Sequence, residues 1–306
     1  VLKHRRIKRI YEKFFFFFVR NMKVYTLNAF AKDIEWWNPA WVVFDSESIS
    51  DTAKQDIAKK LWFSETAFIE RSDKADFKVR FFSPNGEVDL CGHATIATFY
   101  LMLELNHIKT GKYTQETKAW ILTIEAMKDN TIFMNQNLPI FSEVIDKNEI
   151  ADSLNIPIEI VSSDLPIQIV STGLRDILIP IRSLKDLHDI DPNFEKVSEV
   201  SKKYNVIGYH LFSLETQFSG TAHCRNLAPL YDIPEEAATW TSNGALSCYL
   251  FQYKKISPQE ANDLVFEQWY SMGKPSEILA RLEIEWDKIM EVKVWGIASN
   301  IQEQEI

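Results

Sequence analysis

The order of apolar segments repeats along this chain, and the repeat constrains the fold more than any other feature of the sequence. Residues 94–105 and 244–252 are apolar on nearly all sides, which indicates two helices buried within the protein. Each follows a group of strands and an amphipathic helix, and each is followed by further strands. The repeat predicts an α/β (α+β) protein of two similar domains, each a curled, mostly antiparallel sheet around one buried central helix.

The other elements follow from periodicity. In the first half we expect a helix at 50–61, capped by Ser50, and strands at 24–30, 41–44, 66–70, 77–82, 121–125 and 131–135. In the second half we expect a helix at 194–203 and strands at 167–171, 176–181, 208–213, 220–227, 279–285 and 288–294.

A chain of 306 residues is long enough for two domains with separate cores. We predict an N-terminal half-domain over 22–138 and a C-terminal half-domain over 139–289. We expect the strand at 290–302 to return to the first half. The boundary is expected near 137–141.

Residues 1–21 differ from the rest in composition. They carry seven Lys or Arg against one acid, and five phenylalanines follow one another at 14–18. That apolar run is too short for a signal peptide, and no small-residue cleavage site follows it. Because a strand pattern starts just after Met22, we interpret 1–21 as an upstream extension that is not part of the native protein.

Charge and composition exclude several classes of protein. The net charge of −9 argues against nucleic-acid binding. Without a run of about 18 apolar residues, we expect no membrane span. The three cysteines form no disulfide framework and the histidines show no metal-ligand spacing, so we predict a cytoplasmic protein with no metal.

Three short motifs carry the chemistry. The first is Ser-Glu-Thr-Ala-Phe at 64–68. The second is Glu-Val-Asp-Leu-Cys-Gly-His-Ala-Thr at 87–95. The third is Pro-Glu-Glu-Ala-Ala-Thr-Trp-Thr-Ser-Asn-Gly-Ala-Leu at 234–246. The second and third each lead into one of the two apolar helices.

Together the motifs resemble the phenazine-biosynthesis-F-like (PhzF-like) isomerase family, in order and spacing, over nearly all of residues 22–300. The resemblance implies a fold like that of diaminopimelate epimerase, with the active site in the cleft between the halves. It implies a cofactor-free proton shift on a small carboxylated metabolite and a homodimer. It also implies that Glu65 is the acid and base, and it matches His93 and Glu236 to the family's other catalytic positions. Glu236 stands where the family usually has aspartate.

The residues themselves support such a site. Gly92 and His93 open one apolar helix, and Thr241 and Ser242 open the other. Helix N-termini carry free N–H groups and partial positive charge, so two of them facing one cleft would bind a carboxylate. By resemblance the family's carboxylate-binding backbone falls on Gly92–His93 and on Trp240–Thr241. A Glu65 carboxylate sheltered from water would have a raised pKa and serve as a base. His93 and Glu236 would then be its proton partners on the opposite side of the site.

Each residue also has an ordinary structural interpretation. Glu65 could be an exposed acid at a strand end, and His93 could close the first turn of its helix. Glu235 and Glu236 could complement the dipole of the helix that follows them.

Two other functions stay open. Cys91 resembles one thiol of the two-thiol racemases and epimerases of the same fold, but Thr239 occupies the place of the second thiol. We therefore interpret Cys91 as buried packing. The third possibility is a ligand-binding protein of this fold without catalysis.

Tryptophan is unusually frequent and glycine unusually rare. Nine glycines in 306 residues are less than half of the ordinary share of about 7%. Several tryptophans stand where glycine is expected, such as Trp240 at a helix opening and Trp286 in a two-residue hairpin loop, where glycine would form a type II′ turn. We hypothesise that all nine positions are UGA codons read as glycine in the source organism. They are residues 36, 37, 41, 62, 120, 240, 269, 286 and 295.

Overall fold

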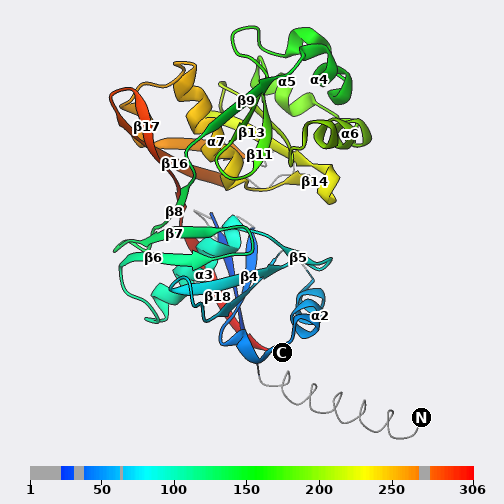
Figure 1. Cartoon of the computed structure of the whole chain (residues 1–306). Coiled ribbons are helices and arrows are strands. Elements are labelled where there is room, and N and C mark those ends of the chain that lie inside the picture. The colour runs from blue at the N-terminus through cyan, green and yellow to red at the C-terminus, as the bar shows by residue number, and fades with distance from the viewer. Residues whose placement is uncertain (1–21, 31–37, 63–64, 269–275) are drawn as a thin grey trace, which may run out of the picture.

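The computed structural model describes residues 22–30, 38–62, 65–268 and 276–306. Figure 1 shows two halves, one above the other, that meet where β8 and β16 run. The expected extension at 1–21 lies outside the described residues.

The N-terminal half contains two helices, α2 (Asp51–Leu61) and α3 (Gly92–Glu104). Its strands are β1 (Lys23–Ala29), β2 (Pro39–Val43), β3 (Thr66–Glu70), β4 (Phe77–Phe82), β5 (Glu87–Val88), β6 (Gly111–Glu116), β7 (Ile121–Ala126) and β8 (Ile132–Gln136).

The C-terminal half contains α4 (Lys147–Leu154), α5 (Leu184–Asp189), α6 (Phe194–Tyr204) and α7 (Trp240–Gln252). Its strands are β9 (Ile140–Val144), β10 (Gln168–Ser171), β11 (Arg175–Pro180), β12 (Gly208–Ser213), β13 (Ala222–Ala228), β14 (Ile233–Glu236), β15 (Leu264–Gln268), β16 (Ser276–Glu285) and β17 (Lys288–Gly296). The last strand, β18 (Ala298–Glu305), crosses back to the N-terminal half.

The two halves repeat the same strand pairing. In the first, β2 pairs parallel with β3 and β4 pairs parallel with β6, while β1–β2, β3–β4, β6–β7 and β7–β8 are antiparallel. In the second, β11–β12 and β13–β15 are parallel, while β10–β11, β12–β13, β15–β16 and β16–β17 are antiparallel. The parallel pairs are those joined through helices, as the geometry of crossover connections requires.

The halves are joined by backbone pairing. β8 pairs antiparallel with β17, so the two sheets are continuous at that edge. β18 pairs antiparallel with β1, and β9 pairs with β10 in the same way. Each half is therefore completed by a strand that lies outside its repeated strands: β18 for the N-terminal half and β9 for the C-terminal half.

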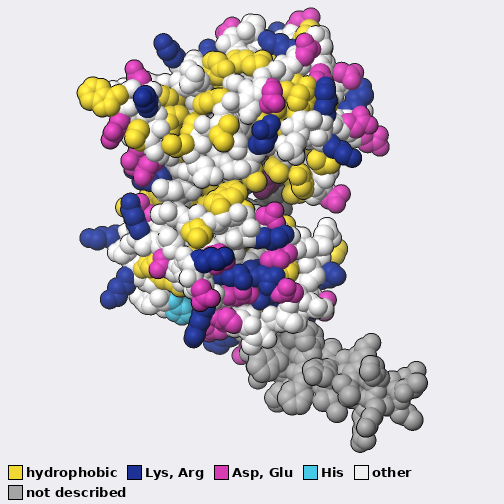
Figure 2. Space-filling model, viewed as in Figure 1, with side chains coloured by type: hydrophobic (Ala, Val, Ile, Leu, Met, Phe, Trp, Pro, Cys, Tyr) yellow, Lys and Arg dark blue, Asp and Glu magenta, His cyan; other side chains and the backbone are white. Residues whose placement is uncertain are grey.

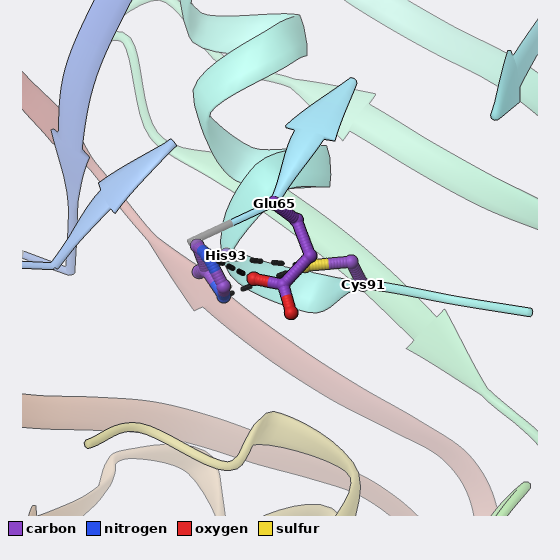
Figure 3. Close-up of side chains that lie close together, drawn as sticks. All are labelled: Glu65, Cys91 and His93. Atoms are coloured by element: carbon purple, nitrogen blue, oxygen red, sulfur yellow. Dashed lines mark hydrogen bonds and ion pairs between the residues drawn. The ribbon is translucent and has the colours of Figure 1, made fainter. Parts of the chain in front are cut away.

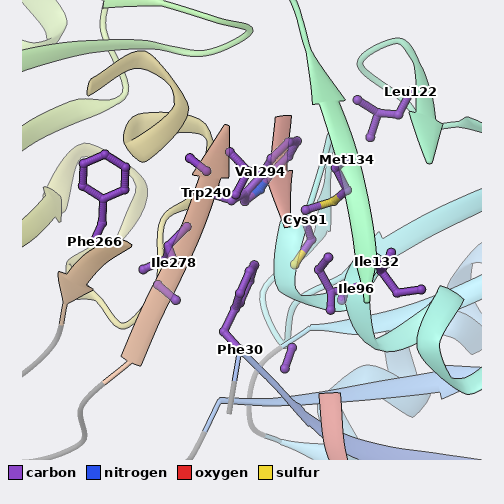
Figure 4. Close-up of a cluster of buried hydrophobic side chains, with 14 of the residues drawn as sticks. Phe30, Cys91, Ile96, Leu122, Ile132, Met134, Trp240, Phe266, Ile278 and Val294 are labelled. Atoms are coloured by element: carbon purple, nitrogen blue, oxygen red, sulfur yellow. The ribbon is translucent and has the colours of Figure 1, made fainter. Parts of the chain in front are cut away.

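The two apolar helices are buried as the sequence predicts. In α3 and α7 nearly every residue of the first three turns is buried, and both helices contribute to one hydrophobic cluster that also receives residues from β1, β8 and β16 (Figure 4). By contrast α2 is amphipathic: Ser50 caps it by accepting a hydrogen bond from the Ala53 amide at 3.3 Å, and only one side is buried.

Several elements were not expected from the sequence. The region 137–141, where we predicted only a boundary, leads into β9, and β5, β6, α4, α5, β14 and β15 were also missed. Many residues of β6, β9, α5 and β14 are exposed or polar, so their patterns are weak. α4 and β15 are partly or largely buried but only eight and five residues long. The segment predicted as one strand at 290–302 is divided between β17 and β18.

Acidic and basic side chains are interspersed on the face shown in Figure 2. Among the described residues, no helix is both long and apolar enough to cross a bilayer.

Candidate active site

Glu65, Cys91 and His93 form a cluster on the N-terminal half (Figure 3). Glu65 immediately precedes β3, Cys91 is the N-cap residue of α3, and His93 lies in the first turn of that helix. Nε2 of His93 lies 3.2 Å from Oε2 of Glu65, and Nδ1 of His93 lies 3.4 Å from Sγ of Cys91. One imidazole ring thus contacts both a carboxylate and a thiol.

Burial and mutual contact set the protonation of this cluster. Burial opposes a positive charge on His93, but the Cys91 and Glu65 groups outweigh it and raise the pKa of His93 well above its ordinary value. Burial also raises the pKa of the Cys91 thiol. Burial thus favours the neutral form of the Cys91 thiol, which is a poor base, and beside a neutral thiol it is the Glu65 carboxylate that stabilises a positive charge on His93.

The same three side chains could hold a cation. Their ligand atoms lie within 4.8 Å of one another, and thiolate, imidazole and carboxylate are the ligand types of zinc. The sequence-based expectation of no metal considered spacing along the chain and did not foresee this convergence, which joins residues from two motifs.

Glu236 ends β14 on the C-terminal half. It is half-buried, and its Oε2 accepts a hydrogen bond from Oγ1 of Thr239 at 2.8 Å. Burial raises the pKa of Glu236 to about 7, and the negative charges of Glu65 and Asp176 act in the same direction, against Thr239 and His93. Glu236 is therefore close enough to the first cluster to respond to its charges, and it holds a proton part of the time at neutral pH.

Buried amides hold Glu236 in place. Nε2 of Gln268 donates to the Glu236 carbonyl at 2.8 Å and to Oγ1 of Thr239 at 3.0 Å. Nδ2 of Asn243 donates to Oε1 of Gln268 at 3.0 Å. Gln268 and Asn243 are both completely buried, so this arrangement has little freedom to move.

The network of hydrogen bonds continues from Asn243 through His210 and Asn226 to Ser242 and Asp176. Nδ2 of Asn226 lies 3.2 Å from Nδ1 of His210, whose Nε2 lies 3.2 Å from Oδ1 of Asn243. Asn226 also donates to Oγ of Ser242 at 3.2 Å, and Ser242 donates to Oδ2 of Asp176 at 2.6 Å. Burial lowers the pKa of His210 to about 4 and raises the pKa of Asp176 to about 6. Neutral His210 thus links the amides on either side of it.

Both buried helices begin without a capping side chain. The N-cap residues are Cys91 for α3 and Thr239 for α7, and neither makes a capping hydrogen bond. Neither first turn contains an acid. Each helix therefore presents an uncompensated partial positive charge at its N-terminus, which favours an anion.

Trp240 lies between these two helix N-termini. A Cβ built on Gly92 would lie 1.8 Å from both Cδ1 and Nε1 of Trp240, so the indole ring is directly against the first residue of α3. Trp240 is buried, and it belongs to the hydrophobic cluster that also contains Cys91 (Figure 4). The indole ring therefore occupies the space next to the amides that we expected to bind a carboxylate.

The structure separates the predicted site residues into two groups. Glu65, Gly92 and His93 lie together, and Glu236 and Trp240 lie on the opposite half. The expectation that His93 lies opposite Glu65 is wrong, because the first turn of α3 places its ring beside the Glu65 carboxylate. The hydroxyl of Ser242 is directed into the buried network, and the carbonyl of Thr241 accepts a hydrogen bond from Oγ1 of Thr172 at 3.2 Å, where α7 meets the loop after β10.

Sequence analysis missed the supporting residues of the second group. Asp176, His210, Asn226 and Gln268 lie in strands in which almost every residue is buried. The signal that could have found them is a polar side chain in each of several otherwise apolar strands, since a buried polar group needs a partner.

Residues 27–304 match the family described as phenazine biosynthesis-like protein, PhzC-PhzF. An uncharacterized isomerase of Clostridium acetobutylicum is 33% identical over 94% of this chain and 99% of its own length. A trans-2,3-dihydro-3-hydroxyanthranilate isomerase of Pseudomonas chlororaphis is 26% identical over 88% of this chain and 94% of its own length.

Solved structures show the same architecture. The crystal structure of a phenazine biosynthesis protein of the PhzF family from Bacillus anthracis has a TM-score of 0.81 at 28% identity, and it covers 94% of this chain and 99% of its own. A hydroxyproline epimerase from Agrobacterium vitis, solved with trans-4-hydroxy-L-proline, has a TM-score of 0.59 at 10% identity over 93% and 91% of the two chains. The second likeness concerns the fold alone, and it confirms the predicted epimerase-like fold.

Proposed function

This chain belongs to the phenazine biosynthesis-like (PhzC-PhzF) family of isomerases, and from that premise we propose that it moves a proton on a small carboxylate-bearing metabolite, with Glu65 as general acid and base. The observation that carries the proposal is the pairing of Glu65 with His93 at the start of α3, 3.2 Å apart, facing an acid on the other half. Groups that differ in protonation on two sides of one site are what a proton shift requires.

The proposed reaction uses this asymmetry. Glu65 as carboxylate takes a proton from a carbon next to an unsaturated or carboxylate-bearing centre. The C–H electron pair is delocalised into that centre, and the proton is returned at another carbon or on the other face. His93 steadies the Glu65 carboxylate. Protonated Glu236 supplies the returning proton from the C-terminal half, and exchange with water then deprotonates Glu65 and reprotonates Glu236 for the next turnover. No cofactor is needed, because the atoms and electrons balance within the substrate.

The substrate class follows from the helix N-termini. The uncapped first turns of α3 and α7 favour a small anion, and no lysine or arginine is needed to bind it. Binding there would orient the reacting carbon toward Glu65, provided that the space taken by the Trp240 ring becomes available.

The test is incorporation of solvent deuterium into a panel of small carboxylic acids, measured by mass spectrometry. It compares the protein that has Trp240 with the Trp240→Gly variant, each with and without the further substitution Glu65→Gln. The matched control is Glu125→Gln, which removes a partly buried carboxylate from β7 on the same half. We expect exchange to fall by about 10²–10⁴-fold in Glu65→Gln and to persist in the control.

Three outcomes decide between the functions. Exchange that survives Glu65→Gln would contradict the role of Glu65. Exchange that instead depends on the Cys91 thiol would favour a two-thiol epimerase, although the described residues place Cys224 and Cys248 within β13 and α7, both completely buried. Binding of an acid without exchange, in a folded protein, would favour the non-catalytic ligand-binding protein.

A further inference from the structure

Trp62 adopts a backbone conformation that suits glycine. It follows the last residue of α2 and has φ 68° and ψ −42°. This is close to the γ-turn conformation, which is rare and strained for a residue with a side chain. The position just after a helix is also where glycine is most common. The indole is 75% exposed, so little packing offsets the strain.

Trp286 presents the same conflict at a hairpin. It joins β16 to β17, with Glu285 opposite Lys288, and φ is 52° at Trp286 and 58° at Asp287. Positive φ at both central residues defines a type I′ turn, whereas the type II′ turn was expected with glycine at 286. Both turn types require positive φ at the first position, which suits glycine, asparagine or aspartate, and where a bulky residue is a clear outlier. Trp286 is 95% exposed.

Trp240 conflicts with function rather than with the backbone. Its ring fills the space beside Gly92, between two helix N-termini that lack a side-chain cap and have no acid within the first turn. A glycine at 240 would remove the ring and leave the amides of both first turns accessible to a ligand. Two strained exposed positions and one obstructed site thus share a single residue type in a chain that is poor in glycine.

We propose that the functional protein has glycine at all nine tryptophan positions, because their shared codon is read as glycine where the protein is made. One change of decoding explains the low glycine content, the positive φ at residues 62 and 286, and the obstruction at residue 240. Otherwise tryptophan must have replaced another residue independently at nine positions. Residues 36, 37 and 269 lie outside the described residues and contribute nothing to the argument.

Trp41 is the strictest test of the proposal. It lies in β2 at 6% exposure and belongs to a hydrophobic cluster with Val24, Ile57 and Phe68, so packing alone would favour tryptophan there. Because a codon is read the same way throughout a chain, the proposal requires glycine at 41 as firmly as at 240.

The test is peptide mass spectrometry on the protein purified from its native cells. Each exchange of tryptophan for glycine removes the mass of an indolylmethyl group, so the peptides that contain residues 41, 62, 240 and 286 report separately. Glycine in all four confirms the proposal. Tryptophan in any one of them overturns it, because the nine positions then do not share one codon that is read as glycine.

A second measurement uses recombinant protein and is independent of isomerase activity. Urea unfolding compares the protein that has all nine tryptophans with its Trp62→Gly and Trp286→Gly variants. The Trp41→Gly variant is included as a substitution at a buried position. If the backbone at 62 and 286 suits glycine, each of these two variants unfolds at a higher urea concentration than the protein with tryptophan there. Loss of stability in both would contradict the argument from φ. Because neither readout involves substrate, failure here is distinguishable from failure of the proposed proton shift.

Discussion

The two sides of the site achieve their chemistry by opposite means. On the N-terminal half, Glu65, Cys91 and His93 are all ionisable and contact one another directly. On the C-terminal half, a single acid, Glu236, is held by hydroxyl and amide groups. The first side can redistribute charge within a few ångströms, whereas the second fixes one carboxyl group in one position.

The difference teaches how a repeated fold becomes an asymmetric catalyst. The strand pairing of the halves is the same, and both central helices start without a cap. The side chains around each start differ. Where charged groups pair, a base is stabilised as carboxylate; where one carboxyl is buried among neutral groups, burial keeps it protonated to higher pH. The variants below test that contrast.

Removing the isolated acid should have the largest effect. We expect Glu236→Gln to lower proton exchange by about 10²–10⁴-fold, because glutamine cannot donate the proton. Since the pKa of Glu236 is raised to about 7, exchange that needs its protonated form should fall as pH rises through about 7. Rate–pH profiles of the wild type and of Glu236→Asp check this. An unchanged profile in Glu236→Gln would remove Glu236 from the mechanism.

The buried carboxyl behind α7 should act on stability. Burial raises the pKa of Asp176 from 3.8 to about 6, so the folded state binds more protons than the unfolded state between those values, and stability falls as pH rises through that window. Asp176→Asn should therefore be about 1–3 kcal/mol more stable than wild type at pH 8 and similar at pH 4. Urea unfolding at both pH values measures it. If Asp176→Asn is instead less stable than wild type by the same amount at both pH values, the lost hydrogen bond to Ser242 dominates.

Loosening the amide support should have a smaller effect on the reaction. Gln268→Met keeps the volume but removes the donor to Glu236 and Thr239. We expect about a tenfold loss of exchange, and a shift of the high-pH limb upward, because the Thr239 hydrogen bond lowers the pKa of Glu236. A loss of rate with no shift of the limb would indicate a general packing defect.

The smallest effect is expected on the N-terminal half, at Cys91. Cys91→Ala removes a neutral, buried thiol, so exchange should fall only about threefold, equivalent to roughly 0.6 kcal/mol. A thiol base would instead cost several orders of magnitude. Single-turnover deuterium exchange distinguishes the two, and Cys248→Ala controls for loss of a buried thiol elsewhere.

The sequence predicted those parts that local patterns determine. The two buried helices and the cap at Ser50 follow from periodicity and capping chemistry. The place of His93 did not follow, because we expected it opposite Glu65 with Glu236, whereas its ring lies 3.2 Å from the Glu65 carboxylate. The support of Glu236 could not be predicted, because Asp176, His210 and Gln268 are far apart in sequence and meet only through sheet pairing. Ser242 was assigned to substrate binding since its position is at a helix start, yet its rotation about the helix directs it to Asp176. The predicted homodimer stays a prediction.

The return of β18 to β1 has a consequence for biosynthesis. β1 pairs on one side with β2 and on the other with β18, and these partners are separated by almost the whole chain. A ribosome that has made the first half therefore leaves one edge of its sheet unpaired until the last residues emerge. During that interval the open strand can pair with another chain, so we expect slowed translation of the second half to favour aggregation and premature termination near Gly296 to be poorly tolerated.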